Sequence, residues 1–331
     1  MPELPEVETL ARGLQESVAG RRILSVTLRK TDFIDDPVAI ERELPGRRIA
    51  RVERFGKFML LQLANKNDAL GAAADSAAAD RNGTPNAAIQ EALLVHLGMT
   101  GNLAPHHAEQ PLAKHTHVTF VLDDGRELRY TDPRRFGRMA YLAGETLTTE
   151  LLRFGAEPLL VTAEEFARRV RSSRARIKTL LLDQRVLRGV GNIYADESLW
   201  SARIHPARAG GSLKLEEVEA LLRALQRILR KAIQMRGSSI SDFVDADGVE
   251  GDYQQHHKVY GREGEKCFRC GATIKRIIVA GRSSHFCPVC QRAPRRKSGS
   301  GVAAVEMRTP RGARVEKKKA KRKMRLRTSK G

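Results

Sequence analysis

The four cysteines of the chain form two pairs, Cys267 with Cys270 and Cys287 with Cys290, and sixteen residues separate the pairs. Each pair has the spacing that lets two sulfurs on one tight turn reach a single metal ion. Four thiolates complete the tetrahedral coordination of zinc, so the predicted ion is structural and leaves no open position for catalysis. A redox pair or free thiols are the alternatives, but clustering within one short segment favours metal in a reducing compartment.

A second candidate for chemistry is the start of the chain, where Pro2 follows Met1 and precedes Glu3 and Glu6. Proline in a first helical turn, with carboxylates near the positive end of the helix, is ordinary capping, and spacing alone favours that interpretation. The chemical alternative is that removal of Met1 frees Pro2 as a secondary amine. Such an amine can attack an aldehyde-like carbon and form an iminium, as lysine does in Schiff-base enzymes.

The net charge predicts a polyanionic partner. The 331 residues include 59 Lys and Arg against 39 Asp and Glu, a net charge of +20. The segment 292–331 carries +14 of this charge and few apolar residues, so we expect a disordered basic tail. Binding of the tail to DNA, binding to another protein and an idle solvated extension all remain open.

The hydrophobic pattern argues against a membrane protein. No apolar run approaches the roughly 18–20 residues that span a bilayer. The first ten residues are acidic where a signal peptide would be basic. We therefore expect a soluble, cytoplasmic protein.

The elements that must position these residues are predicted from periodicity. Residues 3–19 have helical spacing and stop at Gly20, and residues 21–142 have strand patterns with a hairpin signal at Asp124-Gly125. The Ala- and Asn-rich segment 64–92 interrupts the strands as a surface insertion. Residues 150–236 are helical, with a cap at Thr162 and a long amphipathic helix near the end.

The predicted fold is therefore α+β. A helix and an antiparallel β-sandwich occupy 1–142, a helical domain covers 150–261, a zinc hairpin covers 262–291, and the tail follows. The segment 237–261 is polar and rich in Gly and Asp, which predicts a mobile loop with the pair His256-His257 on the surface. The residues between the cysteine pairs alternate as in a β-hairpin, with Arg282 at its tip.

Eight short motifs, in order from residue 2 to about 291, resemble those of the bacterial formamidopyrimidine-DNA glycosylases of the Fpg/Nei family. They are PELPEVE, RFGKFML, HLGMTG, KHTHV, YTDPRRFG, GVGNIYADESL, VYGREGEKC and GRSSHFCPVC. The resemblance skips the insertion and the tail. The related endonuclease VIII-like enzymes usually have Gly where Leu4 stands, so the start favours the purine-repair branch.

The resemblance implies four catalytic residues. Pro2 would be the nucleophile that displaces the damaged base and forms a Schiff base with the sugar. Glu3 would help to open the sugar ring and shuttle protons. Lys57, expected on a strand, would exchange a proton in β-elimination and could contact phosphate. Arg282 would support δ-elimination and bind the phosphate beside the lesion.

The resemblance also implies a DNA-binding set. Asn192, in the turn of a helix–two-turn–helix motif, would present backbone N–H groups to the phosphate of the flipped nucleotide. His115 and Arg134 would contact DNA, and Met99, Arg134 and Phe136 would fill the gap left by the extruded base. A position that is often basic in the family is Ser173 here, so the contact is carried to Arg174. Core packing of Met99 and Phe136 and a structural role for His115 are the alternatives.

These residues together predict a DNA glycosylase with AP lyase activity that removes 8-oxoguanine and formamidopyrimidines and then cleaves by β,δ-elimination. A loop at 237–253, beginning near Ser238, Ser239 and Ser241, is the candidate reader of the flipped base. We expect one zinc ion per chain, no organic cofactor, and a monomer acting on double-stranded DNA. An endonuclease VIII-like enzyme for oxidised pyrimidines and a zinc DNA-binding protein without chemistry are the competing hypotheses.

Overall fold

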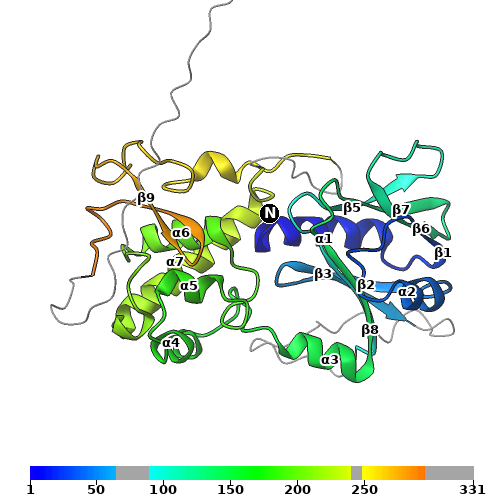
Figure 1. Cartoon of the computed structure of the whole chain (residues 1–331), viewed down its shortest axis with the longest axis horizontal. Coiled ribbons are helices and arrows are strands. Elements are labelled where there is room, and N and C mark those ends of the chain that lie inside the picture. The colour runs from blue at the N-terminus through cyan, green and yellow to red at the C-terminus, as the bar shows by residue number, and fades with distance from the viewer. Residues whose placement is uncertain (65–88, 240–247, 295–331) are drawn as a thin grey trace, which may run out of the picture. The chain divides into compact units, whose positions relative to one another are not determined.

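The computed structural model describes residues 1–64, 89–239 and 248–294, all within one unit, Met1–Arg295 (Figure 1). Most of the predicted insertion, Ser241 and the tail beyond residue 294 lie outside the described residues. Helix α1 (Leu4–Val18) confirms the predicted N-terminal helix. Its buried residues recur at helical spacing, and Gly20 follows with φ +83°, the left-handed conformation that glycine adopts without strain.

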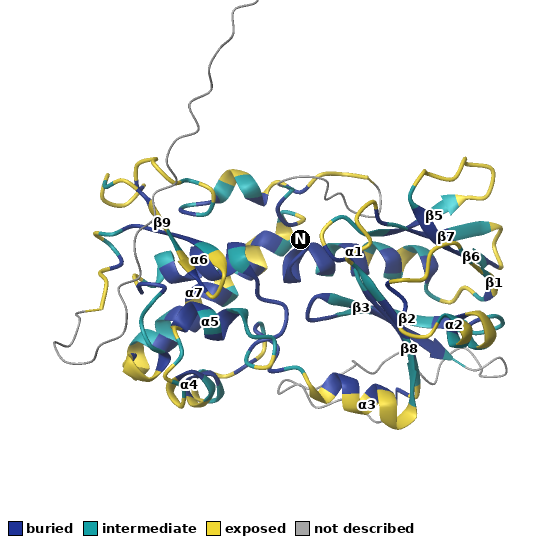
Figure 2. Ribbon diagram, in the orientation of Figure 1, coloured by how far each residue is buried: buried dark blue, intermediate teal, exposed yellow. Residues whose placement is uncertain are grey.

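Two antiparallel four-stranded sheets follow α1, as the strand patterns predict. One sheet has the order β2-β3-β4-β8 and the other β1-β6-β7-β5. The bounds are β1 Ile23–Leu28, β2 Arg48–Phe55, β3 Phe58–Ala64, β4 Glu91–His96, β5 Asn102–His107, β6 Thr116–Leu122, β7 Arg126–Thr131 and β8 Arg138–Ala143. Inward residues of both sheets join α1 in one apolar core, and the buried strands are dark in Figure 2.

The structure corrects two details of this half. Ala64 pairs with Arg48 as the last residue of β3, and Ala92 pairs with Gln62, so both ends of the predicted insertion belong to strands. The strand pattern also hides helix α2 (Pro37–Glu43). Asp36 caps it by accepting the Ala39 N–H at 3.0 Å, a signal that the sequence Asp-Pro contained.

The helical half contains α3 (Gly144–Leu152), α4 (Ala163–Arg171), α5 (Ile177–Leu182), α6 (Asn192–Ser201) and α7 (Leu215–Gln234). Thr162 accepts the Glu165 N–H at 3.3 Å, which confirms the predicted cap of α4. Helices α4 to α7 bury a second apolar core that also contains Leu4 of α1. No described helix is long and apolar enough to cross a membrane.

Strands β9 (Lys275–Val279) and β10 (Arg282–Phe286) form the predicted hairpin between the cysteine pairs. Ala280 and Gly281 make its turn with φ values of +51° and +70°, so Arg282 stands directly after the turn. Strand β10 packs against α6, which places the hairpin on the helical half (Figure 1).

Candidate active site and zinc centre

The carboxylate of Glu3 lies at the amino end of α6. It accepts the N–H groups of Ile193 at 3.0 Å and Tyr194 at 3.5 Å. Gly191 makes this approach possible, because a Cβ there would stand 2.2 Å from the carboxyl carbon of Glu3. Pro2 and Glu3 are both buried. The first residues of the chain therefore sit against the turn that carries Asn192.

Glu6 joins the N-terminal segment to the candidate recognition loop. Its carboxylate accepts the Glu3 N–H at 2.9 Å, the Ser238 N–H at 2.7 Å and the Tyr194 hydroxyl at 2.5 Å. Burial raises the pKa of Glu6, and these donors oppose that rise. The start of the loop at 237–253 is thus fixed to the backbone beside Pro2.

Lys57 lies in a hairpin turn and not on a strand, which corrects the prediction. Phe55 ends β2 and pairs with Phe58 at the start of β3, so Gly56 and Lys57 form a two-residue turn. Gly56 has φ +64°, which a strand pattern does not reveal. Lys57 is buried in this turn, and the charge of Glu3, at the start of the chain, acts on it.

The charges of Glu3 and Arg282 both act on Lys57, although the three residues are far apart in sequence. Burial raises the pKa of Glu3 to about 7, and the charge of Lys57 opposes the rise. Burial lowers the pKa of Lys57, Glu3 opposes that shift, and Arg282 adds to it. Both shifts move the pKa toward neutral pH. A proton donor or acceptor is most effective when its pKa lies near the working pH. Glu3 and Arg282 are therefore both close enough to Lys57 for their charges to act on it, and Pro2 directly precedes Glu3 in the chain.

A buried ion-pair network connects the turn of Lys57 with the turn that leads to α6. The Glu157 carboxylate accepts from the two terminal guanidinium nitrogens of Arg54 at 2.9 and 3.0 Å and from Arg188 at 3.2 Å. Arg188 also stacks on the Phe55 ring at 4.5 Å. Arg54 precedes Gly56-Lys57, and Arg188 precedes the Asn192 turn. The network thus holds these two turns together, and the sequence patterns did not reveal it.

Met99, Arg134 and Phe136 gather at one exposed place. Met99 is 43% exposed and Phe136 63%, which excludes the alternative that they are core residues. The Arg134 guanidinium reaches the Met99 sulfur at 3.6 Å. A Cβ at Gly98 would stand 2.4 Å from the Phe136 carbonyl carbon, so the two loops are packed backbone to backbone.

Asp132 holds these two loops together from beneath. It is fully buried and accepts the Thr100 hydroxyl at 2.6 Å from one loop. From the other loop it accepts the N–H groups of Arg134 and Gly137, each at 3.1 Å. The predicted gap-filling residues therefore lie on two loops that Asp132 holds together. The sequence analysis did not identify this role of Asp132.

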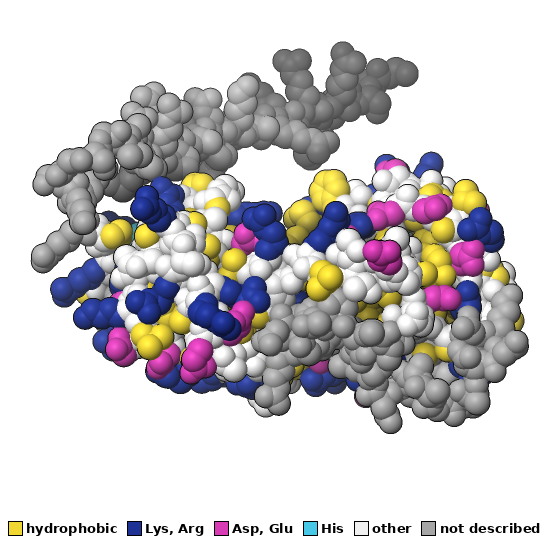
Figure 3. All heavy atoms as spheres, turned by 90° about the horizontal axis from the view of Figure 1, so that it is seen from below, with side chains coloured by type: hydrophobic (Ala, Val, Ile, Leu, Met, Phe, Trp, Pro, Cys, Tyr) yellow, Lys and Arg dark blue, Asp and Glu magenta, His cyan; other side chains and the backbone are white. Residues whose placement is uncertain are grey.

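The other predicted DNA contacts are distributed over several elements. His115 is half-buried beside β6, and its ring lies 6.3 Å from that of buried His117. Asn192 is the first residue of α6, and the next two N–H groups of this helix end, those of Ile193 and Tyr194, donate to Glu3. Arg174 is exposed before α5, and basic side chains are frequent on this helical half, at the left of Figure 3.

The pair His256-His257 differs from its prediction as a surface pair. His257 is buried, and its Nε2 lies 3.1 Å from the Ser238 hydroxyl. Its ring also contacts Tyr253 and Tyr260. The polar composition of the segment gave no signal of this packing, which fixes the far end of the candidate recognition loop to its start.

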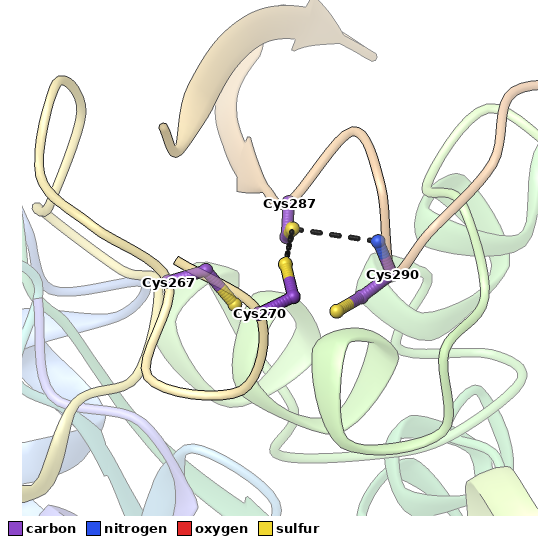
Figure 4. A group of neighbouring side chains, drawn as sticks. All are labelled: Cys267, Cys270, Cys287 and Cys290. Carbon is purple, nitrogen blue, oxygen red and sulfur yellow. Dashed lines mark hydrogen bonds between the residues drawn. The ribbon is translucent and has the colours of Figure 1, made fainter. Parts of the chain in front are cut away.

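The four cysteines form the predicted metal site. Their Sγ atoms all lie within 4.8 Å of one another (Figure 4). Zinc–sulfur bonds of about 2.3 Å in a tetrahedron separate the sulfurs by about 3.8 Å, so this cluster fits one zinc ion. The Trp200 indole N–H and the Cys290 backbone N–H donate to the sulfurs of Cys267 and Cys287 at 3.4 Å, as donors to thiolates do.

Three models of known protein families match successive parts of this chain. They are the formamidopyrimidine-DNA glycosylase N-terminal domain over residues 1–139, the H2TH domain of the same enzymes over 154–244, and the zinc finger found in FPG and IleRS over 264–293. The last match includes all four cysteines, which agrees with a structural zinc site.

Curated relatives are similar along most of the chain. The formamidopyrimidine-DNA glycosylase of Herpetosiphon aurantiacus is 41% identical over 296 residues, covering 88% of this chain and all of the relative. That of Solibacter usitatus is 40% identical with the same coverage. Among solved structures, Lactococcus lactis Fpg with abasic-site DNA has a TM-score of 0.75 at 33% identity, covering 88% of this chain and all of that chain. A mutant of that enzyme with Fapy-dG-containing DNA has a TM-score of 0.76. The chain belongs to the formamidopyrimidine-DNA glycosylase family.

Proposed function

We propose that this protein is a bifunctional DNA glycosylase and AP lyase that removes oxidised purines from double-stranded DNA. The observation that carries the proposal is that Glu3 and Lys57 are buried with charges that act on each other, next in sequence to buried Pro2, while the charge of Arg282 also acts on Lys57. Relatives at about 40% identity carry the name formamidopyrimidine-DNA glycosylase, and similar structures hold Fapy-dG or abasic-site DNA. A DNA-binding protein without chemistry would have no need to bury Pro2, Glu3 and Lys57.

The proposed reaction begins when the Pro2 amine attacks C1′ of the flipped nucleotide. The glycosidic bond breaks, and the base leaves with the bonding electrons and takes up a proton. Glu3, with a pKa of about 7, donates a proton to the sugar ring oxygen, and the ring opens to an iminium at Pro2. Loss of the C2′ proton then expels the 3′ phosphate, and loss of the C4′ proton expels the 5′ phosphate. Lys57 and Arg282 assist these two eliminations.

The exposed side chains complete the proposal. Extruding a base costs a few kcal/mol, least for a damaged base, and apolar side chains occupy the space that it leaves. Met99 and Phe136 suit this role because they are exposed on two loops that Asp132 holds together. Arg134 supplies a planar donor for the orphaned base, and Asn192 lies at a helix end suited to phosphate.

The test is incubation of the purified protein, with Met1 removed, with duplex DNA that contains one 8-oxoguanine, in the presence of borohydride. The proposal predicts a covalent protein–DNA adduct that maps to Pro2, because borohydride reduces the iminium to a stable amine. Binding without an adduct would instead support the hypothesis of a non-catalytic zinc protein.

Lesion choice gives a second prediction. Oxidation to 8-oxoguanine replaces the N7 acceptor by an N–H donor, which one carbonyl of the recognition loop can distinguish. A carbonyl left facing the lone pair of guanine costs roughly 1–3 kcal/mol, so this contact supplies part of the discrimination. We expect excision of 8-oxoguanine opposite C, with slower excision opposite A because Arg134 faces the orphaned base. Parallel cleavage of 8-oxoguanine:C, 8-oxoguanine:A and thymine glycol:A duplexes measures this, and preference for thymine glycol would assign the pyrimidine-repair function.

The pKa of Glu3 predicts how excision depends on pH. Its acid form is the donor, so single-turnover excision should fall as the pH rises through about 7. Glu3→Gln cannot donate this proton, so it should be slow and should lose the decline near pH 7. Rates measured between pH 5.5 and 9 check this, and an unchanged decline in Glu3→Gln would assign it to another group.

We further propose that the protein acts as a monomer in the cytoplasm, where it associates with the nucleoid. The basic excess supports association with DNA through counterion release.

A further inference from the structure

Two buried charged residues hold the strand that carries Arg282. Lys178 of α5 and Asp196 of α6 are fully buried, and their charged atoms lie 2.6 Å apart. Neither residue belongs to the proposed catalytic or metal-binding set. They come from the helical half, whereas Arg282 comes from the zinc hairpin, so their contacts join two separate parts of the chain.

The contacts engage the three residues that directly follow Arg282. Lys178 donates to the Ser283 carbonyl at 2.7 Å. The Asp196 carboxylate accepts the Ser284 hydroxyl at 3.0 Å and the His285 N–H at 2.8 Å. Apolar packing alone would fix only the distance of β10 from α6. These hydrogen bonds also fix the position of β10 along its own axis.

Asp196 also connects the hairpin to the DNA-binding end of α6. It stands four residues after Asn192, one helical turn along the same face. The next residue, Glu197, accepts the backbone N–H groups of Lys258, Val259 and Tyr260 at 2.9 Å. One helix therefore positions the phosphate contact, the segment before the zinc site and the strand of Arg282.

The chemistry of the pair favours orientation over stability. Burying two charges has a desolvation cost that their attraction often does no more than offset, and apolar replacements can be equally stable. A hydrogen-bonded pair, however, permits only one placement of its partners. Zinc fixes the base of the hairpin, where Cys287 follows β10, but leaves the tip dependent on contacts along the strand.

We propose that Asp196, together with Lys178, is a positioning residue that aligns Arg282 with the phosphate site at the start of α6 and thereby sets the efficiency of δ-elimination. The inference rests on the proposed function, because it needs a lyase reaction to act upon. Asp196 does not contact the reacting atoms; it acts through the backbone and hydroxyl of β10.

The experiment compares Ser284→Ala with Ser283→Ala in the full-length zinc protein. Ser284→Ala removes one donor to Asp196. Ser283→Ala is the matched control, because the Ser283 hydroxyl accepts from Arg276 and not from the Lys178–Asp196 pair, and its carbonyl still accepts from Lys178. Asp196→Asn, which removes the charge, is the stronger variant. The substrate is duplex DNA with a preformed abasic site, which bypasses base recognition.

Three measurements distinguish an effect on δ-elimination from a loss of the folded structure. They are zinc content, the rate of borohydride trapping and the ratio of β-elimination to δ-elimination products. We expect Ser284→Ala to raise this ratio about tenfold, the size of one lost hydrogen bond to a charged group. Asp196→Asn should raise it further, with zinc and trapping kept, while Ser283→Ala matches the wild type.

An unchanged product ratio in Ser284→Ala would overturn the inference. So would an equal loss of trapping and δ-elimination, because the pair would then only stabilise the fold. Failure of the wild-type protein to trap abasic DNA would refute the proposed function instead. Since Ser284→Ala leaves the ion pair intact, the test stands even if Asp196→Asn does not fold.

Discussion

An N-terminal extension that blocks Pro2 should abolish excision and borohydride trapping while DNA binding persists. An acylated proline nitrogen has no lone pair to donate, so neither the attack on C1′ nor the iminium can form. The expected loss is on the order of 10³-fold or more, as for removal of other catalytic nucleophiles. Binding should persist because Met1 is 47% exposed, so added residues can extend into solvent without displacing buried Glu3.

The matched control carries the same extension at the carboxyl end, and mass spectrometry verifies that its Met1 is removed. Single-turnover excision, trapping and equilibrium binding to an uncleavable abasic analogue are then measured on both proteins. Full activity with a blocked amine would rule out Pro2 as the nucleophile. Loss of binding together with activity would show that the extension blocks the DNA surface.

Removing zinc should eliminate binding and cleavage together. The hairpin has a small apolar core of its own, built around Val259, Ile274, Cys267 and Cys287. Metal binding at four thiolates, worth about 10–16 kcal/mol in comparable sites, therefore supplies most of its folding free energy. Cys287→Ala should release the hairpin and displace Arg282, and we expect cleavage to fall at least about 100-fold, as after loss of a donor to a developing charge.

Val289→Ser is the control for the zinc prediction. Val289 lies in the same Cys-x2-Cys turn but is 55% exposed and is not a ligand, so zinc and activity should remain. Metal analysis, DNA binding and strand cleavage are compared for both variants. Active protein without zinc, whether obtained by chelation or by Cys287→Ala, would contradict a structural role for the ion.

The parts that the sequence predicted best are those set by local spacing. The cysteine pairs needed only tight turns to meet, and α1 needed only one apolar face. Gly56-Lys57 was missed because apolar residues on both sides continue the strand pattern through a turn of two residues. The resemblance supplied the identities of Pro2, Glu3 and Arg282, but only the structure shows that the charges of Glu3 and Arg282 both act on Lys57.

Buried polar contacts could not be predicted from any local pattern. Arg54 and Glu157 are 103 residues apart, and Lys178 lies 105 residues before Ser283. Charged residues are usually solvated, so no sequence pattern singles out Lys178 and Asp196 as buried. Their burial depends on partners that only the tertiary fold provides. The polar loop residue His257 was misplaced for the same reason.

The contact of Glu3 with the start of α6, and the action of the Arg282 charge on Lys57, have a consequence for the newly made chain. The site contains residues from both ends of unit Met1–Arg295, so it cannot assemble until the zinc hairpin leaves the ribosome. At about 5–20 residues per second, synthesis as far as Arg282 alone takes roughly 14–56 s after the N-terminus is made. During that interval Pro2, which is buried in the finished fold, remains accessible to the peptidase that removes Met1. The length of the chain therefore sets when the site is complete, and a nascent fragment that ends before Arg282 lacks the complete site.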